Sequence, residues 1–226
     1  MVWILPTYNR PAQCAAVLNR LVDKGVSTDG VVVVNGEDGS KVESEVETAA
    51  VKMGWDVVKR SENVGALGAL NFVFKERPNE KFYGFIGDDE FVETDNWNTK
   101  LIEAAGDWDI SHGDDGVQGG KRAQSYLCIG GALARGVGYL AIPECWHWYG
   151  LDDMWELLAR MGVCKKVFVP EVKIDHRHPY QGKGEMDATY ALGESRKDID
   201  YQIFCHWQRT ELKNVCERVK KARGAA

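Results

Sequence analysis

The chain has 226 residues, of which 44% are hydrophobic and 27% are charged, with 24 glycines and six prolines. This composition excludes a disordered or fibrous chain and predicts a domain that can bury a core without a disulfide or metal staple. The net charge of -6 and the pI near 5.5 argue against a generic nucleic-acid coat protein, because such domains are usually basic.

Strand and helix signals alternate through the first part of the chain. In order, the predicted elements are strand Val2–Leu5, helix Pro11–Lys24, strand Val31–Val34, a helix from a capping box of Ser40 and Glu43 to Gly54, strand Trp55–Lys59, helix Gly65–Arg77 and strand Phe82–Gly87. This alternation predicts an α/β fold with a Rossmann-like, doubly wound, mostly parallel sheet. Its ligand crevice is expected beyond the carboxyl ends of the strands.

The second part of the chain is less regular. Ser111–Arg122 is a Gly-rich polar loop that serves either as a mobile lid or as a plain connector. The elements predicted after it are strand Ser125–Ile129, helix Asp152–Met161, strands Cys164–Val169 and Val172–His176 separated by Pro170, and a C-terminal helix over about 198–222.

The six cysteines are widely spread and form no C-x-x-C pair, which favours reduced thiols and a cytoplasmic protein. The N-terminus has no basic leader before its short apolar run, so we expect no secretion signal. No stretch approaches the roughly 20 apolar residues of a membrane helix, so we expect no membrane span.

Three consecutive carboxylates, Asp88, Asp89 and Glu90, follow a predicted apolar strand. Unpaired, they would repel each other, whereas Mg2+ or Mn2+ would take their oxygens as ligands and hold a diphosphate at the same time. The alternative is an acidic turn exposed to water. His176 and His178 are two apart on a predicted strand, so both could face these carboxylates and complete the metal shell, or both could be hydrogen-bonded surface residues.

Two further features carry possible chemistry. Lys183, in the turn after the histidines, is a candidate clamp for a diphosphate. Asp152 and Asp153 open a predicted helix, where the helix dipole stabilises acidic residues. The functional interpretation makes one of these two carboxylates a general base.

Together these motifs resemble the GT-A nucleotide-sugar glycosyltransferases, particularly compact, soluble, family-2-like members. The resemblance covers about Val2–Tyr190, and its motifs are Leu5–Arg10, Glu62–Asn71, Gly87–Glu90 with Trp97 after it, Gly130–Ala132, the Asp152–Asp153 pair and a terminal histidine. It implies one domain, 1–226, with a nucleotide-binding half over about 1–110. A smaller antiparallel part, over about 111–190, would face the acceptor and complete the metal site.

The resemblance also implies a role for each matching position. The enzyme would be metal-dependent and inverting, and would move a sugar from a nucleoside diphosphate to an acceptor hydroxyl, with Asp153, or alternatively Asp152, as the catalytic base. Asp88, Asp89 and Glu90 would form the D-x-D motif that holds ribose and metal, Mn2+ or Mg2+, with His176 or His178 as a further ligand. The other implied positions are Pro6, Thr7, Tyr8 and Arg10 at base and ribose, Asn63, Gly65 and Asn71 lining the nucleotide pocket, and Gly130 and Gly131 at sugar and acceptor.

Several alternatives remain open from the residues. Family members often carry an aspartate that reads uracil where this chain has Asn35, followed by Glu37 and Asp38, so a UDP-sugar is only weakly favoured as the donor. The acceptor would be a small molecule or a saccharide. The basic C-terminal tail, the Lys121–Arg122 pair and the cluster of Trp146, Trp148 and Tyr149 admit a hydroxymethylated base in DNA as the acceptor, as in some viral sugar transferases. Functions of another class are a sugar-nucleotide nucleotidyltransferase and a non-catalytic nucleotide-sugar-binding module.

Overall fold

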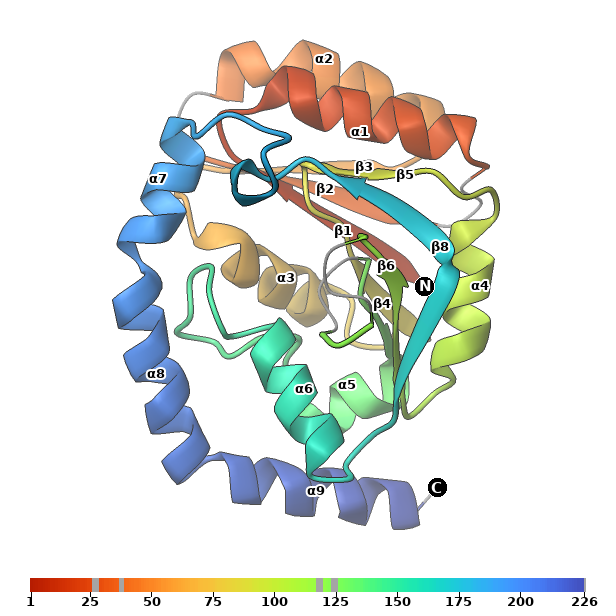
Figure 1. The fold of residues 1–226 in the computed structure, drawn as a ribbon, viewed down its shortest axis with the longest axis vertical. Helices are drawn as coiled ribbons and strands as arrows, with labels where there is room; N and C mark the ends of the chain where they lie inside the picture. The colour runs from red at the N-terminus through yellow and green to blue at the C-terminus, as the bar shows by residue number, and fades with distance from the viewer. Residues whose placement is uncertain (26–28, 37–38, 117–119, 123–125, 226) are drawn as a thin grey trace.

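The structure is a computed structural model that describes residues 1–25, 29–36, 39–116, 120–122 and 126–225, without the side chains of residues 39–43. An eight-stranded sheet runs through its centre in the order β3-β2-β1-β4-β7-β6-β8-β5 (Figure 1). The first elements are β1 (Val2–Thr7), α1 (Pro11–Asp23), β2 (Gly30–Asn35), α2 (Gly39–Met53), β3 (Asp56–Arg60), α3 (Gly65–Glu76) and β4 (Phe82–Phe85).

These first elements confirm the predicted alternation. The strands β3, β2, β1 and β4 are parallel to one another. The valines of β2 explain why the sheet is covered on both sides, since Val31 and Val33 belong to one core cluster and Val32 and Val34 to the other. Helices α1 and α2 pack on one face and α3 on the other (Figure 1). The side chains of the capping box, Ser40 and Glu43, lie outside the described residues.

The antiparallel pairs of the sheet involve strands that come after β4 in the chain. The elements after β4 are β5 (Glu90–Val92), α4 (Trp97–Ala105), β6 (Ile110–Asp114), β7 (Cys128–Gly130), α5 (Gly131–Val137), α6 (Asp152–Arg160), β8 (Lys166–His176), the 3-10 helix η1 (Pro179–Gln181), α7 (Ala188–Ser195), α8 (Lys197–Thr210) and α9 (Leu212–Gly224). Strand β7 is antiparallel to β4 and β6, and β5 is antiparallel to β8. The sheet is therefore mixed, because β6 and β8 are again parallel to each other.

Two predictions in this part of the chain are corrected. The two strands expected on either side of Pro170 form the single strand β8. Its pairing with β6 jumps between the His112–Phe168 and Asp114–Lys173 pairs, so Pro170 lies at an irregularity, where a residue without an N–H is tolerated. The predicted C-terminal helix is two helices that meet at Glu211, and α9 turns away from α8 to run beneath α5 and α6 (Figure 1).

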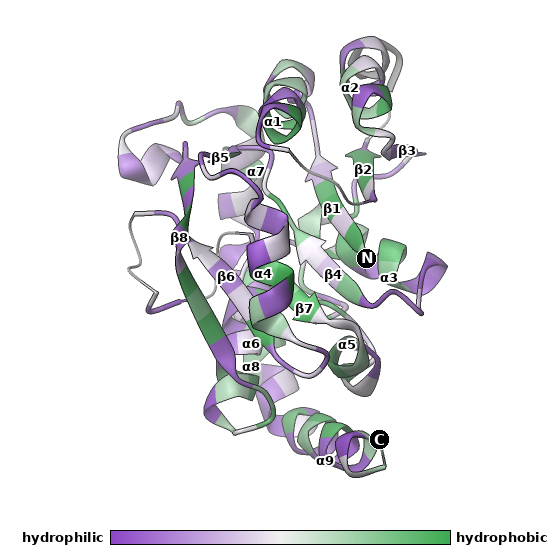
Figure 2. Cartoon of the chain, turned by 90° about the vertical axis from the view of Figure 1, so that its right-hand side faces the viewer, coloured by the Kyte–Doolittle hydropathy of each residue, from purple (hydrophilic) through white to green (hydrophobic). Residues whose placement is uncertain are grey.

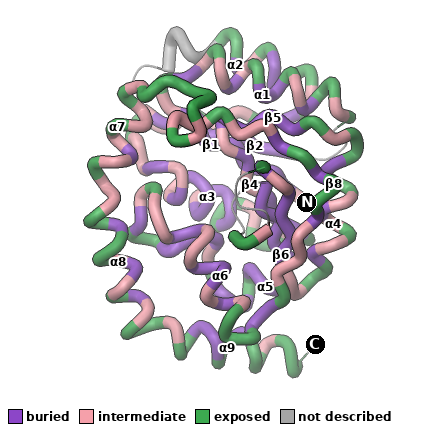
Figure 3. The backbone as a smooth tube through the Cα atoms, in the orientation of Figure 1, coloured by how far each residue is buried: buried purple, intermediate pink, exposed green. Residues whose placement is uncertain are grey.

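The hydrophobic residues gather in the central strands and on the inner faces of the helices (Figure 2). The buried part of the backbone follows the same strands, and the exposed residues lie mainly on the outer helices (Figure 3). All six cysteines are free thiols, five of them buried. No helix in the described ranges has the length and apolar character that a membrane crossing needs.

Candidate active site

A cavity of about 380 Å³ opens at the carboxyl ends of β1, β2 and β4, where the sequence predicted a ligand crevice. This volume lies within the range of small-molecule and cofactor sites. Most of the predicted site residues line it together: Pro6, Thr7, Tyr8, Arg10, Asn35, Asn63, Gly65, Asp88, Asp89, Glu90, Asp152, His176 and His178. The structure thus brings into one cavity residues that are up to 172 positions apart in the chain.

Two carboxamides, from the buried Asn35 and the partly buried Asn63, line the cavity, and both make a hydrogen bond to the backbone of Gly65. The Asn35 amide nitrogen donates to the Gly65 carbonyl at 3.5 Å, and the Gly65 N–H donates to Asn63 Oδ1 at 3.0 Å. These bonds leave Asn35 Oδ1 as a buried acceptor and Asn63 Nδ2 as a buried donor with no partner among the described residues. Because unpaired buried polar groups are costly, this part of the cavity suits a polar planar group that both accepts and donates.

Gly65 is required by its backbone as well as by its surroundings. It has φ +73°, and a Cβ there would lie 2.2 Å from the Trp146 carbonyl oxygen. We expect Gly65→Ala to lower the free energy of unfolding by about 2 kcal/mol or more and to weaken nucleotide binding. Gly54→Ala is the matched control, because Gly54 has φ +69° with nothing near its Cβ. Equal losses for the two variants, measured by denaturant unfolding, would contradict a role for the close approach to Trp146.

Asp88 follows β4 and contacts Thr7 at the end of the neighbouring strand β1. Its carboxylate accepts from Thr7 Oγ1 at 2.8 Å and from the Arg10 guanidinium at 3.1 Å. Burial, together with the neighbouring charge of Asp89, raises the pKa of Asp88 to about 6, although Arg10 and Thr7 oppose the shift. Asp88 is therefore fixed by β1 and by the loop that follows it.

Arg10 also connects Asp88 to the C-terminal part of the chain. Its guanidinium makes two hydrogen bonds of 2.7 Å to the carboxylate of Asp187 and lies 3.7 Å from the ring centre of Tyr190. Burial would lower the pKa of Arg10, but Asp187 and Asp88 outweigh it and raise that pKa. Neither Asp187 nor Tyr190 was expected from the sequence, because nothing local links them to Arg10 across more than 170 residues.

The acidic end of the cavity is built by the pairing of β5 with β8, which sets Glu90 opposite His176. Asp89 Oδ2 accepts from the Tyr190 hydroxyl at 2.6 Å and lies 3.4 Å from His176 Nε2. Burial would raise the pKa of Asp89, but His176 and Tyr190 outweigh it and lower that pKa below its usual range. Asp89 is therefore ionised at neutral pH.

Glu90 and His178 have other partners. Glu90 Oε2 accepts from the Gly87 N–H at 2.8 Å, which closes the turn that carries the three acids. His178 Nδ1 accepts from the Tyr180 N–H at 3.2 Å and so caps η1. The Nδ1 of His178 is thus occupied by a structural hydrogen bond, although the ring still lines the cavity.

Two of these side chains fit a divalent cation. Ligand bonds of about 2.1 Å place two donors on one cation roughly 3.0–3.4 Å apart, which is close to the 3.4 Å between Asp89 Oδ2 and His176 Nε2. His176 Nδ1 makes no hydrogen bond within the described residues, but it lies 3.9 Å from Asp115 and 4.0 Å from Glu90. Burial would lower the pKa of His176, but Asp115 and Asp89 raise it to about 10, so a cation and a proton would compete for this imidazole.

No cluster of three or more His, Cys, Asp and Glu side chains in the described ranges is arranged to hold a metal ion by itself.

The two acids at the start of α6 have different surroundings. Asp152 lines the cavity, whereas Asp153 forms an ion pair with Arg122, from the end of the Gly-rich loop. Burial and the neighbouring charge of Asp152 raise the pKa of Asp153 to about 6, against the opposing effect of Arg122. Both acids lie near the cavity, and Asp152 is the one that reaches its surface.

Besides Asp153, four predicted positions lie outside the lining of this cavity. Asn71 is buried in α3, and its side chain bonds the backbone of Leu140 and Ala141. Gly130 and Gly131 lie against the backbones of Asp107 and Glu80, where a Cβ would come within 2.3 Å of a carbonyl oxygen. Lys183 is half-exposed and pairs with Asp175 at 2.8 Å beside a separate hollow.

The loop of Trp146, His147 and Trp148 forms a wall of the cavity and is held from behind by α8. The fully buried carboxylate of Asp200 accepts the three backbone N–H groups of this loop at 2.8–3.0 Å. The two tryptophans were noticed in the sequence as an aromatic cluster, but Asp200 was not, because one aspartate on a predicted surface helix gives no signal of burial.

The fold is shared with solved glycosyltransferase structures. One is GalNAc-T7 with UDP, GalNAc and Mn2+, with a TM-score of 0.64 at 11% identity over 77% of this chain and 43% of that one. A second is S. aureus TarS 1-349 with UDP, with a TM-score of 0.58 at 15% identity over 76% and 59%. A third is glucosyl-3-phosphoglycerate synthase from Mycobacterium tuberculosis with Mn2+, UDP and glucosyl-3-phosphoglycerate, with a TM-score of 0.54 at 16% identity over 85% and 77%.

At these identities the likeness establishes the fold alone, which is the GT-A fold of glycosyltransferases. This chain spans less than half of the GalNAc-T7 chain. Residues 2–123, more than half of the chain, match the family model of glycosyl transferase family 2. The chain therefore belongs to glycosyl transferase family 2. A search of curated proteins gives no match.

Proposed function

We propose that the protein is a metal-dependent, inverting glycosyltransferase that moves a sugar from a nucleoside diphosphate to an acceptor hydroxyl. The observation that carries the proposal is the order of groups along one cavity. Asn35, joined to Asn63 through Gly65, follows β2, and Asp88 follows β4 and contacts Thr7 of β1, the strand between them. Asp89 comes next and lies beside His176 of β8. That order suits a base, a ribose and a diphosphate in turn, and UDP in solved structures of the same fold supports it.

The carboxamides are proposed to bind the base of the donor. A uracil ring carries an imide N–H beside a carbonyl oxygen, which would meet Asn35 Oδ1 and Asn63 Nδ2. Asp88 would accept from a ribose hydroxyl while Thr7 and Arg10 hold it in place. Asp89 and His176 would hold Mn2+ or Mg2+, and that cation would neutralise charge on the leaving diphosphate.

Asp153 is proposed to accept the proton of the acceptor hydroxyl, with Asp152 at the cavity surface as the alternative base. A pKa of about 6 leaves Asp153 ionised at neutral pH and close in basicity to the operating range. We propose a small molecule or a saccharide as the acceptor. The DNA alternative gains no support from Arg122, because this cation is paired with Asp153.

The function is tested by incubating the protein and Mn2+ with UDP-, GDP- and dTDP-sugars and measuring sugar release, with and without chelator. Turnover of one nucleotide class that chelator abolishes is the expected result. Nucleotide binding without turnover would instead indicate a binding module. Release of pyrophosphate from a nucleoside triphosphate and a sugar phosphate would indicate a nucleotidyltransferase.

Asp153→Asn is expected to lower transfer by about 10²- to 10⁴-fold, the usual contribution of a general base, while donor affinity stays within about twofold. The kcat of transfer and donor binding by calorimetry are the measurements. Asp152→Asn is the informative partner, because the two residues are neighbours on the same helix turn. A larger loss of kcat in Asp152→Asn than in Asp153→Asn would move the base assignment to Asp152.

A further inference from the structure

The segment 120–122, at the end of the Gly-rich loop, is fastened to α6 and β8. Lys166 Nζ, from β8, donates to the Lys121 carbonyl at 2.7 Å and to the Gly120 carbonyl at 3.3 Å. The same ammonium pairs with Glu156 of α6 at 2.6 Å. The ammonium of the partly buried Lys166 thus contacts two backbone carbonyls of the segment and one carboxylate of α6. These contacts hold the segment against the helix that carries Asp153.

Arg122 extends from this fixed segment to Asp153. The Asp153 side chain is 20% exposed and that of Arg122 is 43% exposed, so the ion pair lies at the border of the solvent. The other charged groups around Asp153 are Asp152 and Glu156, from its own helix, and both favour its protonated form. Arg122 opposes burial and these two acids, whose combined effect still raises the pKa of Asp153 to about 6.

We propose that Arg122 is a positioning residue that holds Asp153 ionised and oriented at the start of α6, so that the segment 120–122 controls the state of this carboxylate. The functional meaning of this contact rests on the proposed role of Asp153 as the base. The contact itself does not depend on that role. It is an ion pair between the side chains of Arg122 and Asp153, and Lys166 holds the segment that carries Arg122.

The titration of the Asp153 carboxyl, followed by carbon-detected NMR of 13C-labelled protein, tests the proposal directly. Removing the charge in Arg122→Gln leaves burial, Asp152 and Glu156, so the midpoint is expected to rise by about one pH unit. Lys121→Gln is the matched control, since it removes the same charge from the neighbouring residue, whose side chain is exposed and whose backbone carbonyl makes the contact. Arg122→Lys should restore part of the shift.

An unchanged midpoint in Arg122→Gln, or an equal rise in Lys121→Gln, would overturn the proposal. A second measurement separates this result from the proposed function. If Asp153 is the base, the acidic limb of the pH profile of donor turnover should also move up by about one unit in Arg122→Gln. Full turnover in Asp153→Asn, together with a raised midpoint of the Asp153 carboxyl in Arg122→Gln, would refute the base assignment and leave the role of Arg122 intact.

Discussion

Asp89→Asn is expected to lower donor turnover by at least about a hundredfold and to weaken Mn2+ binding. The amide keeps the shape of the side chain but loses the charge that would hold a divalent cation beside His176. It also exchanges a charged acceptor of the Tyr190 hydroxyl for a neutral one. Calorimetry with Mn2+ and turnover of the preferred nucleotide sugar are the two measurements.

Asp95→Asn is the control for this substitution. Asp95 lies six positions further along the chain, and its side chain is 74% exposed. It pairs with Lys24, and neither residue lines the cavity. Both activity and Mn2+ affinity should survive there. If Asp89→Asn kept its activity and its Mn2+ affinity, the acidic end of the cavity would not be a metal site.

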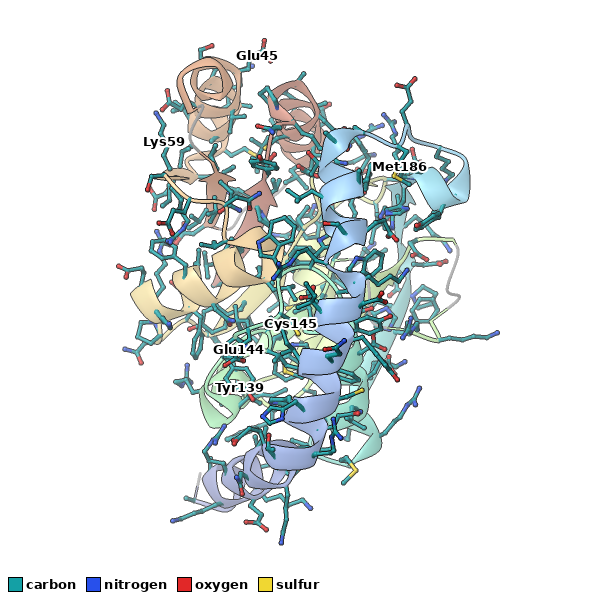
Figure 4. The ribbon with its side chains drawn as sticks, turned by 90° about the vertical axis from the view of Figure 1, so that its left-hand side faces the viewer. Glu45, Lys59, Tyr139, Glu144, Cys145 and Met186 are labelled. Atoms are coloured by element: carbon teal, nitrogen blue, oxygen red, sulfur yellow. The ribbon has the colours of Figure 1, made fainter. Side chains whose placement is uncertain are left out.

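Asp200→Ala is expected to lower the free energy of unfolding by about 3 kcal/mol, which for a chain of this size corresponds to a fall in Tm of about 6–12 °C. The buried carboxylate accepts three N–H groups from the loop 146–148, and the alanine leaves all three without it. The thiol of Cys145, which lies beside α8 in Figure 4, donates to the backbone carbonyl of Asp200 at 3.6 Å, a contact that the alanine variant keeps. Thermal unfolding is the measurement.

Two further variants keep this prediction sharp. Asp198→Ala removes an exposed carboxylate from the same helix turn and should change Tm by little. Asp200→Asn retains one oxygen acceptor and should fall between the wild type and Asp200→Ala. Because the loop forms a wall of the cavity, nucleotide affinity should decrease in the same order as Tm. A Tm within about 2 °C of the wild type in Asp200→Ala would contradict the role of this carboxylate.

The sequence predicted the parallel half of the fold because its signals there are local. The valines of β2, the proline at the start of α1 and the glycine after it each act within one element. The sequence also predicted that the residues after the parallel strands lie close together, because the carboxyl ends of these strands meet at one edge of the sheet. In the structure one cavity is lined by Thr7, Asn35, Asn63 and Asp88.

The remaining parts of the site depend on contacts between distant segments. The short strand β5 has three residues and no pattern of its own, and it forms because β8 is available to pair with it. Asn71 stands in a motif typical of a nucleotide pocket, but its side chain is used to hold the backbone at 140–141. The sequence shows an amide at that position and cannot show which backbone lies within its reach.

Because β5 and β8 form an antiparallel pair, the acidic end of the cavity depends on whether an insertion in β8 has an odd or an even number of residues. Glu90 faces His176 only in one register, and successive side chains on a strand point to opposite faces. Inserting a single residue into β8 after the irregularity at Pro170 would turn the imidazole away from Asp89, whereas inserting two would preserve its direction. Length changes in this strand are therefore expected to be tolerated in even steps and to remove activity in odd ones.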